Sequence, residues 1–207
     1  MKYKQWRVAP PCKEGQLVLE QAGLPSLLAG LLAARGIVSP EEACRLVSPR
    51  SEPIPDPMLL RDMDRASARV RLALERGERI AVYGDYDVDG ITATCLLTQF
   101  LSSRGGDVVP YIPSRLGEGY GLNSEAVQIL AGQGVSLIIT VDCGITAVEE
   151  TALANRLHID VVITDHHACK ETLPPAAAVV DPHRPDCPYP FKGLAGVGVA
   201  LMLALAV

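Results

Sequence analysis

Aromatic side chains are scarce in this sequence, which has one Trp, six Tyr and two Phe, or 4% of its residues. A hydrophobic core must therefore be built mainly from Ala, Leu, Val and Ile. No run of about 18 apolar residues occurs, so the sequence predicts no membrane-spanning helix. The amino terminus also lacks the apolar segment of a secretory signal peptide. We therefore expect a cytoplasmic protein that does not bind membranes.

Several common catalytic motifs are missing as well. No two of the six cysteines are spaced as Cys-x-x-Cys, which gives no support for a zinc ribbon or a thioredoxin-like centre. We expect these thiols to be reduced, as is usual in the cytosol. The sequence has no P-loop, no G-x-S-x-G and no H-E-x-x-H. These absences argue against P-loop nucleotide hydrolysis, serine-hydrolase chemistry and a zincin protease.

The charge is unevenly distributed along the chain. The formal net charge is −5, but residues 1–79 hold 13 Lys and Arg against 10 acids, whereas residues 80–207 hold 6 against 14. Taken alone, the acidic total argues weakly against a nucleic-acid partner. Six arginines lie between positions 61 and 79. They either contact a phosphate backbone or form a solvated helix face paired with its own acids.

Composition divides the chain into two parts. Residues 1–57 predict a mainly helical extension followed by a linker with four prolines between positions 49 and 57. Ser39-Pro40-Glu41-Glu42 is a strong helix start, with an N-cap hydroxyl, Pro at the first helical position and two acids in the first turn. Residues 58–207 predict the second domain.

Short apolar segments alternate with helical segments in this second domain. Strands are expected at 79–83, 108–112, 137–141, 159–163 and 177–180, and helices at 58–76, 91–101, 123–130 and 147–157. Continuous apolar strands between helices are typical of a parallel sheet with both faces covered. The predicted fold class is α/β, with a parallel sheet of about five strands flanked by helices.

Acidic residues and histidines follow three of the expected strands. The set after these strand ends comprises Asp85, Asp87, Asp89, Asp142, Asp165, His166 and His167. The carboxyl ends of parallel strands meet at one edge of a sheet, so these side chains are expected to share one crevice. Carboxylates and imidazoles without thiolates suit Mn²⁺ or Mg²⁺. Crowded carboxylates repel one another unless cations neutralise them, which favours a site for two divalent ions.

Each motif also has a plain structural interpretation. The DYDVDG run matches the first half of an EF-hand loop, but Leu96 falls where that loop requires a bidentate Glu. Asp142-Cys143-Gly144 alone is typical of a strand-to-helix turn. His166-His167 alone is compatible with a surface pair. The shared position of all three motifs at strand ends favours the metal site.

A glycine-rich loop lies between the second expected strand and the next helix. Gly117, Gly119 and Gly121 stand at alternate positions, and Tyr120 lies between the last two. Arg115 begins the loop. It either holds a phosphate with its planar guanidinium or is an ordinary surface residue.

These motifs together resemble the DHH phosphoesterase superfamily, which is named for the triplet present here as Asp165-His166-His167. Within it, the sequence is most similar to RecJ-type exonucleases specific for single-stranded DNA, and the similarity runs nearly end to end. The segments that carry it are Gly84–Gly90, Glu118–Leu122, Thr140–Ile145, Ile163–His167 and Pro190–Val199. Residues 58–207 would then be a DHH domain.

The resemblance implies a role for each matching residue. Asp87, Asp89 and His166 would ligate two Mn²⁺ or Mg²⁺ ions, and Asp142 would bridge them. His167 would contact the scissile phosphate, while Asp85 and Asp165 would act close to the metals. Arg115, with the loop residues Gly119, Tyr120 and Gly121, would hold the substrate phosphate.

The implied reaction is hydrolysis of single-stranded DNA from its 5′ end in DNA repair and recombination. The resemblance further implies a monomer, with a single-strand-binding protein or a helicase as protein partner. The family carries a later metal-binding Asp and further DNA-gripping domains that do not occur before Val207. We therefore expect weak or absent activity from these residues alone.

Two other functions stay open at this point. The first is a different DHH enzyme, which would act on short oligoribonucleotides or cyclic dinucleotides. The extension before Arg79 and the glycine-rich loop argue against it. The second is a non-catalytic scaffold in a replication complex. The intact acids and histidines argue against that, because a scaffold has no need of crowded carboxylates.

Overall fold

The computed structural model describes residues 8–47, 53–114, 119 and 121–207. By their internal contacts the residues form two compact units, Met1–Ile54 and Pro55–Val207. None of the described helices is long and apolar enough to cross a bilayer. Each unit has a hydrophobic core of its own.

The first unit contains three short helices: α1 (Lys13–Gln21), α2 (Ser26–Ala33) and α3 (Pro40–Val47). Its small core consists of Leu19, Leu24, Ala29 and Ala43. The predicted helix start at Ser39 is present, because the Ser39 hydroxyl accepts the amide of Glu42. Between α1 and α2, Gly23 turns the chain with a φ of 93°, and Pro25 directly precedes α2.

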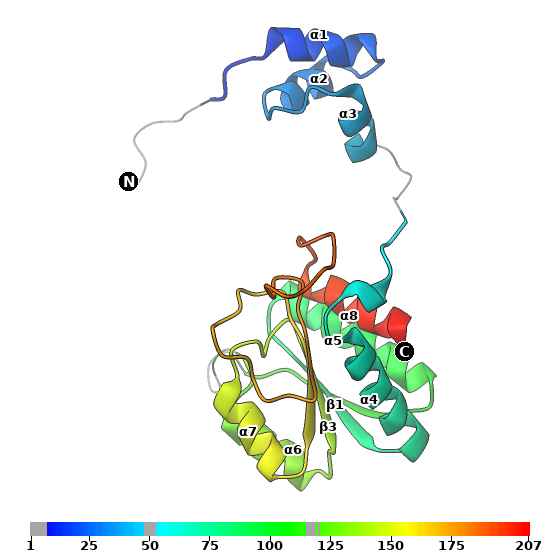
Figure 1. Ribbon diagram of the computed structural model, residues 1–207, viewed down its shortest axis with the longest axis vertical. Helices are drawn as coiled ribbons and strands as arrows, with labels where there is room; N and C mark the ends of the chain where they lie inside the picture. The colour runs from blue at the N-terminus through cyan, green and yellow to red at the C-terminus, as the bar shows by residue number, and fades with distance from the viewer. Residues whose placement is uncertain (1–7, 48–52, 115–118, 120) are drawn as a thin grey trace. The chain divides into compact units, whose positions relative to one another are not determined.

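The second unit is a five-stranded parallel sheet covered by helices on both faces (Figure 1). Its strands are β1 (Arg79–Gly84), β2 (Asp107–Tyr111), β3 (Leu137–Val141), β4 (Asp160–Thr164) and β5 (Ala178–Val180), in the spatial order β2-β1-β3-β4-β5. The predicted fold class and strand number are confirmed. The chain crosses from one side of β1 to the other between β2 and β3, so the order reverses between β1 and β3. Ligands bind at such a reversal in open α/β sheets.

Alternate strand residues pack against opposite helical layers. Ile80 and Val82 of β1 face α4 (Met63–Arg76), α5 (Val88–Ser103) and α8 (Gly196–Ala206). Ala81 and Tyr83 face α6 (Ser124–Gly132) and α7 (Val148–Arg156). Both layers are almost free of aromatic rings, as the composition requires. The parallel strands are apolar on both faces for this reason.

The helix expected at 58–76 is interrupted near its start. A 3₁₀ turn spans Pro57–Leu59, and α4 begins only at Met63. Asp62 separates them with a left-handed φ of 62°. Its carboxylate accepts a hydrogen bond from Arg184, which is 122 residues away, so a distant contact sets this break.

The arginines of the basic segment at 61–79 pair with other groups of the same chain. Arg69 lies 2.6 Å from both Glu78 and Asp160, and Arg71 donates to the carbonyl of Ala206. The remaining arginines of the segment also have acidic partners, namely Asp186 for Arg61, Asp62 for Arg65, Glu78 for Arg76 and Asp107 for Arg79. Of the two interpretations of this segment, the paired helix face agrees better with these contacts.

Candidate metal centre

The loop after β1 carries three aspartates and turns directly into α5. Asp85 is buried, whereas Asp87 is exposed and caps α5, its Oδ1 accepting the amides of Asp89 and Gly90 at 2.9 and 3.0 Å. A Cβ on Gly90 would lie 2.5 Å from the carbonyl oxygen of Asp85, so only glycine fits this turn. The cap uses one oxygen of Asp87 and leaves the other for a cation.

Asp142 follows β3, which lies between β1 and β4 in the sheet, and its carboxylate is almost fully buried. It is 2% exposed and has a left-handed φ of 60°, a conformation that Asp and Asn tolerate better than most residues. Burial raises the pKa of Asp142 to about 7, with further contributions from the negative charges of Asp89 and Asp87. A cation would relieve both the desolvation and the repulsion.

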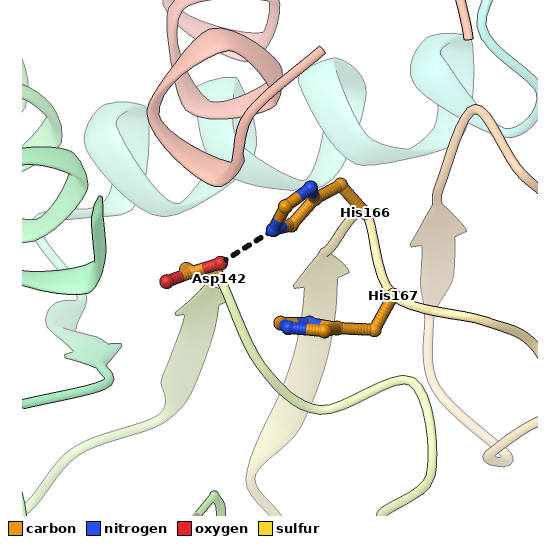
Figure 2. Close-up of side chains that lie close together, drawn as sticks. All are labelled: Asp142, His166 and His167. Carbon is orange, nitrogen blue, oxygen red and sulfur yellow. Dashed lines mark ion pairs between the residues drawn. The ribbon is translucent and has the colours of Figure 1, made fainter. Parts of the chain in front are cut away.

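Asp165, His166 and His167 follow β4, the neighbour of β3. The Nε2 of His166 lies 3.0 Å from Oδ1 of Asp142 (Figure 2). The Nδ1 of His167 lies 2.7 Å from Oδ1 of the buried Asp165. That contact fixes the ring and leaves Nε2 of His167 as the nitrogen that can reach a ligand.

The contact between Asp165 and His167 shifts the pKa values of the two side chains in opposite directions. Burial alone would raise the pKa of Asp165, but hydrogen bonds from His167 and from the amide of Ile145 outweigh it and lower that pKa. The hydrogen bond to Asp165 raises the pKa of His167 to about 9, against the effect of its own partial burial. The imidazole of His167 is therefore cationic at neutral pH in the metal-free protein.

Asp89 is bound by the amino terminus of α8. Its two carboxylate oxygens accept the amides of Gly196 and Val197, both at 2.8 Å. The Nε2 of His166 lies 3.7 Å from Asp89. A Cβ on Gly196 would lie 2.5 Å from the Asp142 side chain, so glycine is required for α8 to approach the two acids. Gly196 thus allows the tight packing of α8 against these acids.

These residues form two overlapping groups that share Asp142. One contains Asp142, His166 and His167, and the other contains Asp85, Asp87 and Asp142. Within each group one donor atom from every residue lies within 4.8 Å of the others. Carboxylate oxygens and imidazole nitrogens are donors that Mn²⁺ and Mg²⁺ accept, so the residues present fit such ions. Asp89 lies beside both groups but belongs to neither in this conformation.

A fourth strand-end acid, Asp181, escaped the sequence analysis. It directly follows β5, is fully buried and lies close enough to Asp165 and His166 for their charges to affect it. Burial raises the pKa of Asp181 to about 6. The rule that located the other acids, an Asp directly after an apolar strand, would have found this residue too.

Of the glycine-rich loop, the candidates Arg115 and Tyr120 lie outside the described residues. Gly119 and Gly121 are described, with left-handed φ values of 81° and 79° that favour glycine. The Tyr83 hydroxyl donates to the carbonyl of Gly121 at 2.8 Å and accepts a hydrogen bond from Asn123. The end of this loop is therefore attached to β1, the strand that leads to Asp85.

A protein-family comparison identifies the second unit. Residues 79–206 match the model described as the DHH family, N-terminal domain. The chain belongs to the DHH family. This match spans all five strands and every residue of the two metal-ligand groups, so the DHH fold and the candidate site coincide.

Individual DHH proteins give a closer comparison. The chain is 41% identical over 203 residues to the single-stranded-DNA-specific exonuclease RecJ of Bacillus subtilis, which covers 98% of this chain and 26% of that protein. It is 40% identical over 159 residues to RecJ of Thermus thermophilus, covering 75% of this chain and 24% of that protein. The chain thus spans about a quarter of the length of these relatives.

Solved structures agree with this assignment. A structure of Thermus thermophilus RecJ in complex with Mn²⁺ matches 95% of this chain and 27% of its own length, with a TM-score of 0.70 and 32% identity. A structure of exonuclease RecJ bound to manganese matches 71% of this chain and 37% of its own, with a TM-score of 0.65 and 40% identity. A Mg²⁺ complex of the Thermus thermophilus protein is also similar. Each of these three solved structures is a complex of RecJ with Mn²⁺ or Mg²⁺.

Proposed function

We propose that this chain carries the metal-binding part of a phosphodiesterase that shortens single-stranded DNA from its 5′ end. The observation that supports this most strongly is the pair of overlapping ligand groups joined by Asp142 at the point where the strand order reverses. The similarity to RecJ supports the choice of substrate. The chain spans only about a quarter of the length of those relatives. The proposed activity and substrate are therefore those of the protein that contains this sequence.

In this proposal the site holds two divalent ions, Mn²⁺ or Mg²⁺. Asp85, Asp87, Asp142, His166 and Asp89 would hold them, and Asp142 would contact both. Asp89 would exchange at least one of its hydrogen bonds from α8 for this role. Divalent ions at such a site supply Lewis acidity toward phosphoryl oxygens and neutralise the crowded carboxylates.

The residues of the chain would divide the remaining work. His167, held by Asp165 at Nδ1, would direct Nε2–H toward the phosphate or the departing oxygen. Arg115 would bind a phosphate oxygen beside the site, on the loop that Tyr83 attaches to β1. The Gly119 and Gly121 backbone would allow that loop to follow the substrate. A monomeric state, and a single-strand-binding protein or a helicase as partner, stay predictions.

The test measures hydrolysis by the gene product that contains this sequence. Single- and double-stranded oligonucleotides with a 5′ label are incubated with Mn²⁺ or with a chelator. We expect nucleotides to be released from the 5′ end of the single strand only, and only with metal. Asp142→Asn should reduce the rate at least about a thousandfold, because it removes the shared ligand while keeping a residue that tolerates left-handed backbone.

Glu171→Gln provides a control, because it neutralises an exposed acid outside both ligand groups. It should leave the rate unchanged. Binding of Mn²⁺ measured by calorimetry should show two ions for each wild-type chain and fewer for Asp142→Asn. Metal-independent cleavage, or undiminished cleavage by Asp142→Asn, would exclude this site as the centre of hydrolysis. Cleavage of cyclic dinucleotides in preference to single-stranded DNA would point to a different DHH activity.

A further inference from the structure

A second aspartate–histidine pair directly follows β5, the strand beside β4 in the sheet. Thr164 at the end of β4 is the register partner of Val180 at the end of β5. Each is followed directly by a buried Asp, and a His lies two residues further along. The pairs are Asp165 with His167 and Asp181 with His183.

The two pairs share a hydrogen bond from the histidine amide to the carboxylate but differ in the distance to the imidazole. Oδ1 of Asp165 accepts the amide of His167 at 3.2 Å and faces its Nδ1 at 2.7 Å. Oδ1 of Asp181 accepts the amide of His183 at 2.7 Å and faces its Nδ1 at 3.7 Å. Both imidazoles are about half exposed, at 46% and 43%. The amide contact and the exposure of His167 are thus repeated at His183, whereas the ring of His183 lies too far from Asp181 for a hydrogen bond.

The loop that carries His183 is held by two cations. Arg184 is 8% exposed and donates to the carbonyl of Val179, to Asp62 and, with two nitrogens, to Asp186. Lys192 donates to the carbonyls of Pro182 and Cys187 at 2.8 and 2.7 Å. These contacts fix the backbone on both sides of His183. An exposed polar side chain on a fixed loop is well placed to bind a ligand.

A cavity of about 430 Å³ opens beside this histidine. Its lining includes Ala168 and Cys169, which directly follow the DHH triplet, and His183 and Pro185 from the second loop. The cavity therefore adjoins the His167 side of the metal centre. Its volume is within the range of pockets that hold small organic groups.

The chemistry of this cavity favours an anion over a metal ion or a base. Among the described residues, no third His, Cys, Asp or Glu joins Asp181 and His183 in a ligand group. Apart from His183, no aromatic side chain is among the four lining residues on which a base could stack. The exposed imidazole of His183 offers a ring N–H donor to a phosphate oxygen.

We propose that His183 binds a phosphate of the single-stranded DNA adjacent to the one that is cleaved. Nε2–H would donate to a non-bridging oxygen of that phosphate, while Asp181 fixes the backbone amide of His183 and lies 3.7 Å from Nδ1. This inference rests on the proposed function. It adds a substrate contact just after β5, the neighbour of the strand that leads to His167.

The test compares wild type and His183→Ala in the full gene product, with Mn²⁺, by steady-state hydrolysis. We expect KM for a single-stranded oligonucleotide to rise about tenfold with kcat within about twofold, because a charge-assisted hydrogen bond to a bound phosphate is lost. His158→Asn is the control. His158 is an exposed histidine just before β4, at the opposite end of the strands, and Asn suits its left-handed φ of 59°.

Two modified substrates identify the phosphate. One lacks the 5′-terminal phosphate, and the other carries a neutral methylphosphonate at the second linkage from the 5′ end. With one of them, the difference between wild type and His183→Ala should disappear, because the contact is already absent. A merely structural role for His183 would leave the difference equal on all substrates.

Failure of the inference and failure of the proposed function give different results. Wild-type hydrolysis with an unchanged KM in His183→Ala, or with an equal defect on every substrate, overturns the role of His183 alone. If wild type hydrolyses no DNA with Mn²⁺, the proposed function is wrong. The same comparison is then made from binding of 5′-phosphorylated oligonucleotide by fluorescence anisotropy, where an unchanged Kd in His183→Ala overturns the inference also.

Discussion

The buried carboxylate of Asp142 should lower the free energy of unfolding of the metal-free protein at neutral pH. Replacing Asp142 by Asn should measure that loss. The folded state holds this carboxyl with a pKa of about 7, against an ordinary value of 3.8. The folded state therefore binds a proton more tightly than the unfolded state does. Stability is unaffected below about pH 4, falls as the pH rises from about 4 to 7, and stays low above that. The loss at pH 8 is about 4 kcal/mol.

Asp142→Asn should abolish this loss. The amide is nearly isosteric with the carboxylate, tolerates the left-handed backbone and carries no charge. In a chelator at pH 8, we expect the variant to exceed wild type in free energy of unfolding by about 4 kcal/mol, and at pH 4 to differ little. Urea unfolding followed by far-ultraviolet circular dichroism measures both. Glu171→Gln, on an exposed loop, should show no comparable pH dependence.

With saturating Mn²⁺, wild type should become more stable than Asp142→Asn. A ligand that binds only the folded state stabilises it in proportion to the logarithm of its concentration over Kd, so wild type should gain more than Asp142→Asn. The reasoning would be refuted by a variant that is less stable than wild type in chelator at pH 8. It would also be refuted if the difference between them did not vary with pH.

Three further substitutions test other parts of the structure. Gly196→Ala should lower the free energy of unfolding by about 1–3 kcal/mol and weaken Mn²⁺ binding in calorimetry, whereas Gly198→Ala, which has more space, should do neither. Arg184→Met should lower the free energy of unfolding in urea by about 3–5 kcal/mol, because Asp62 loses its buried cation and keeps only the longer contact with the exposed Arg65; equal stability would contradict the Arg184 contact. His167→Gln should reduce DNA hydrolysis at least about a hundredfold and should also lower the melting temperature, because the buried Asp165 loses its cationic partner; full activity would remove His167 from the reaction.

The sheet could be predicted from the sequence because local and global signals agree there. β3 is an apolar run of five residues, and its bounds, Leu137–Val141, are those expected. The break at Asp62 could not be predicted, because a contact with Arg184 across the unit holds it. Helix bounds elsewhere differ by a few residues, as at α5, which begins at Val88 because Asp87 caps it.

The candidate site was predictable to a similar degree. An acid directly after β1, β3, β4 and β5 is visible in the sequence, and parallel topology brings Asp85, Asp142 and His166 to one edge. The link between Asp89 and the amides of α8 joins residues more than 100 positions apart, and no local pattern indicates it. The roles of individual ligands stay predictions, because carboxylates reorient when a cation enters.

The two edge strands of the sheet are poorly suited to pairing with a strand of another chain, which matters at high protein concentration. The central strands are almost wholly apolar, and an exposed edge beside them would invite pairing with another chain. β2, at one edge, contains Pro110, which has no N–H to donate, and β5, at the other, is only three residues long. Both edges therefore offer an incoming strand few hydrogen bonds. The sheet that assembles the metal centre is thus protected from growing into an aggregate.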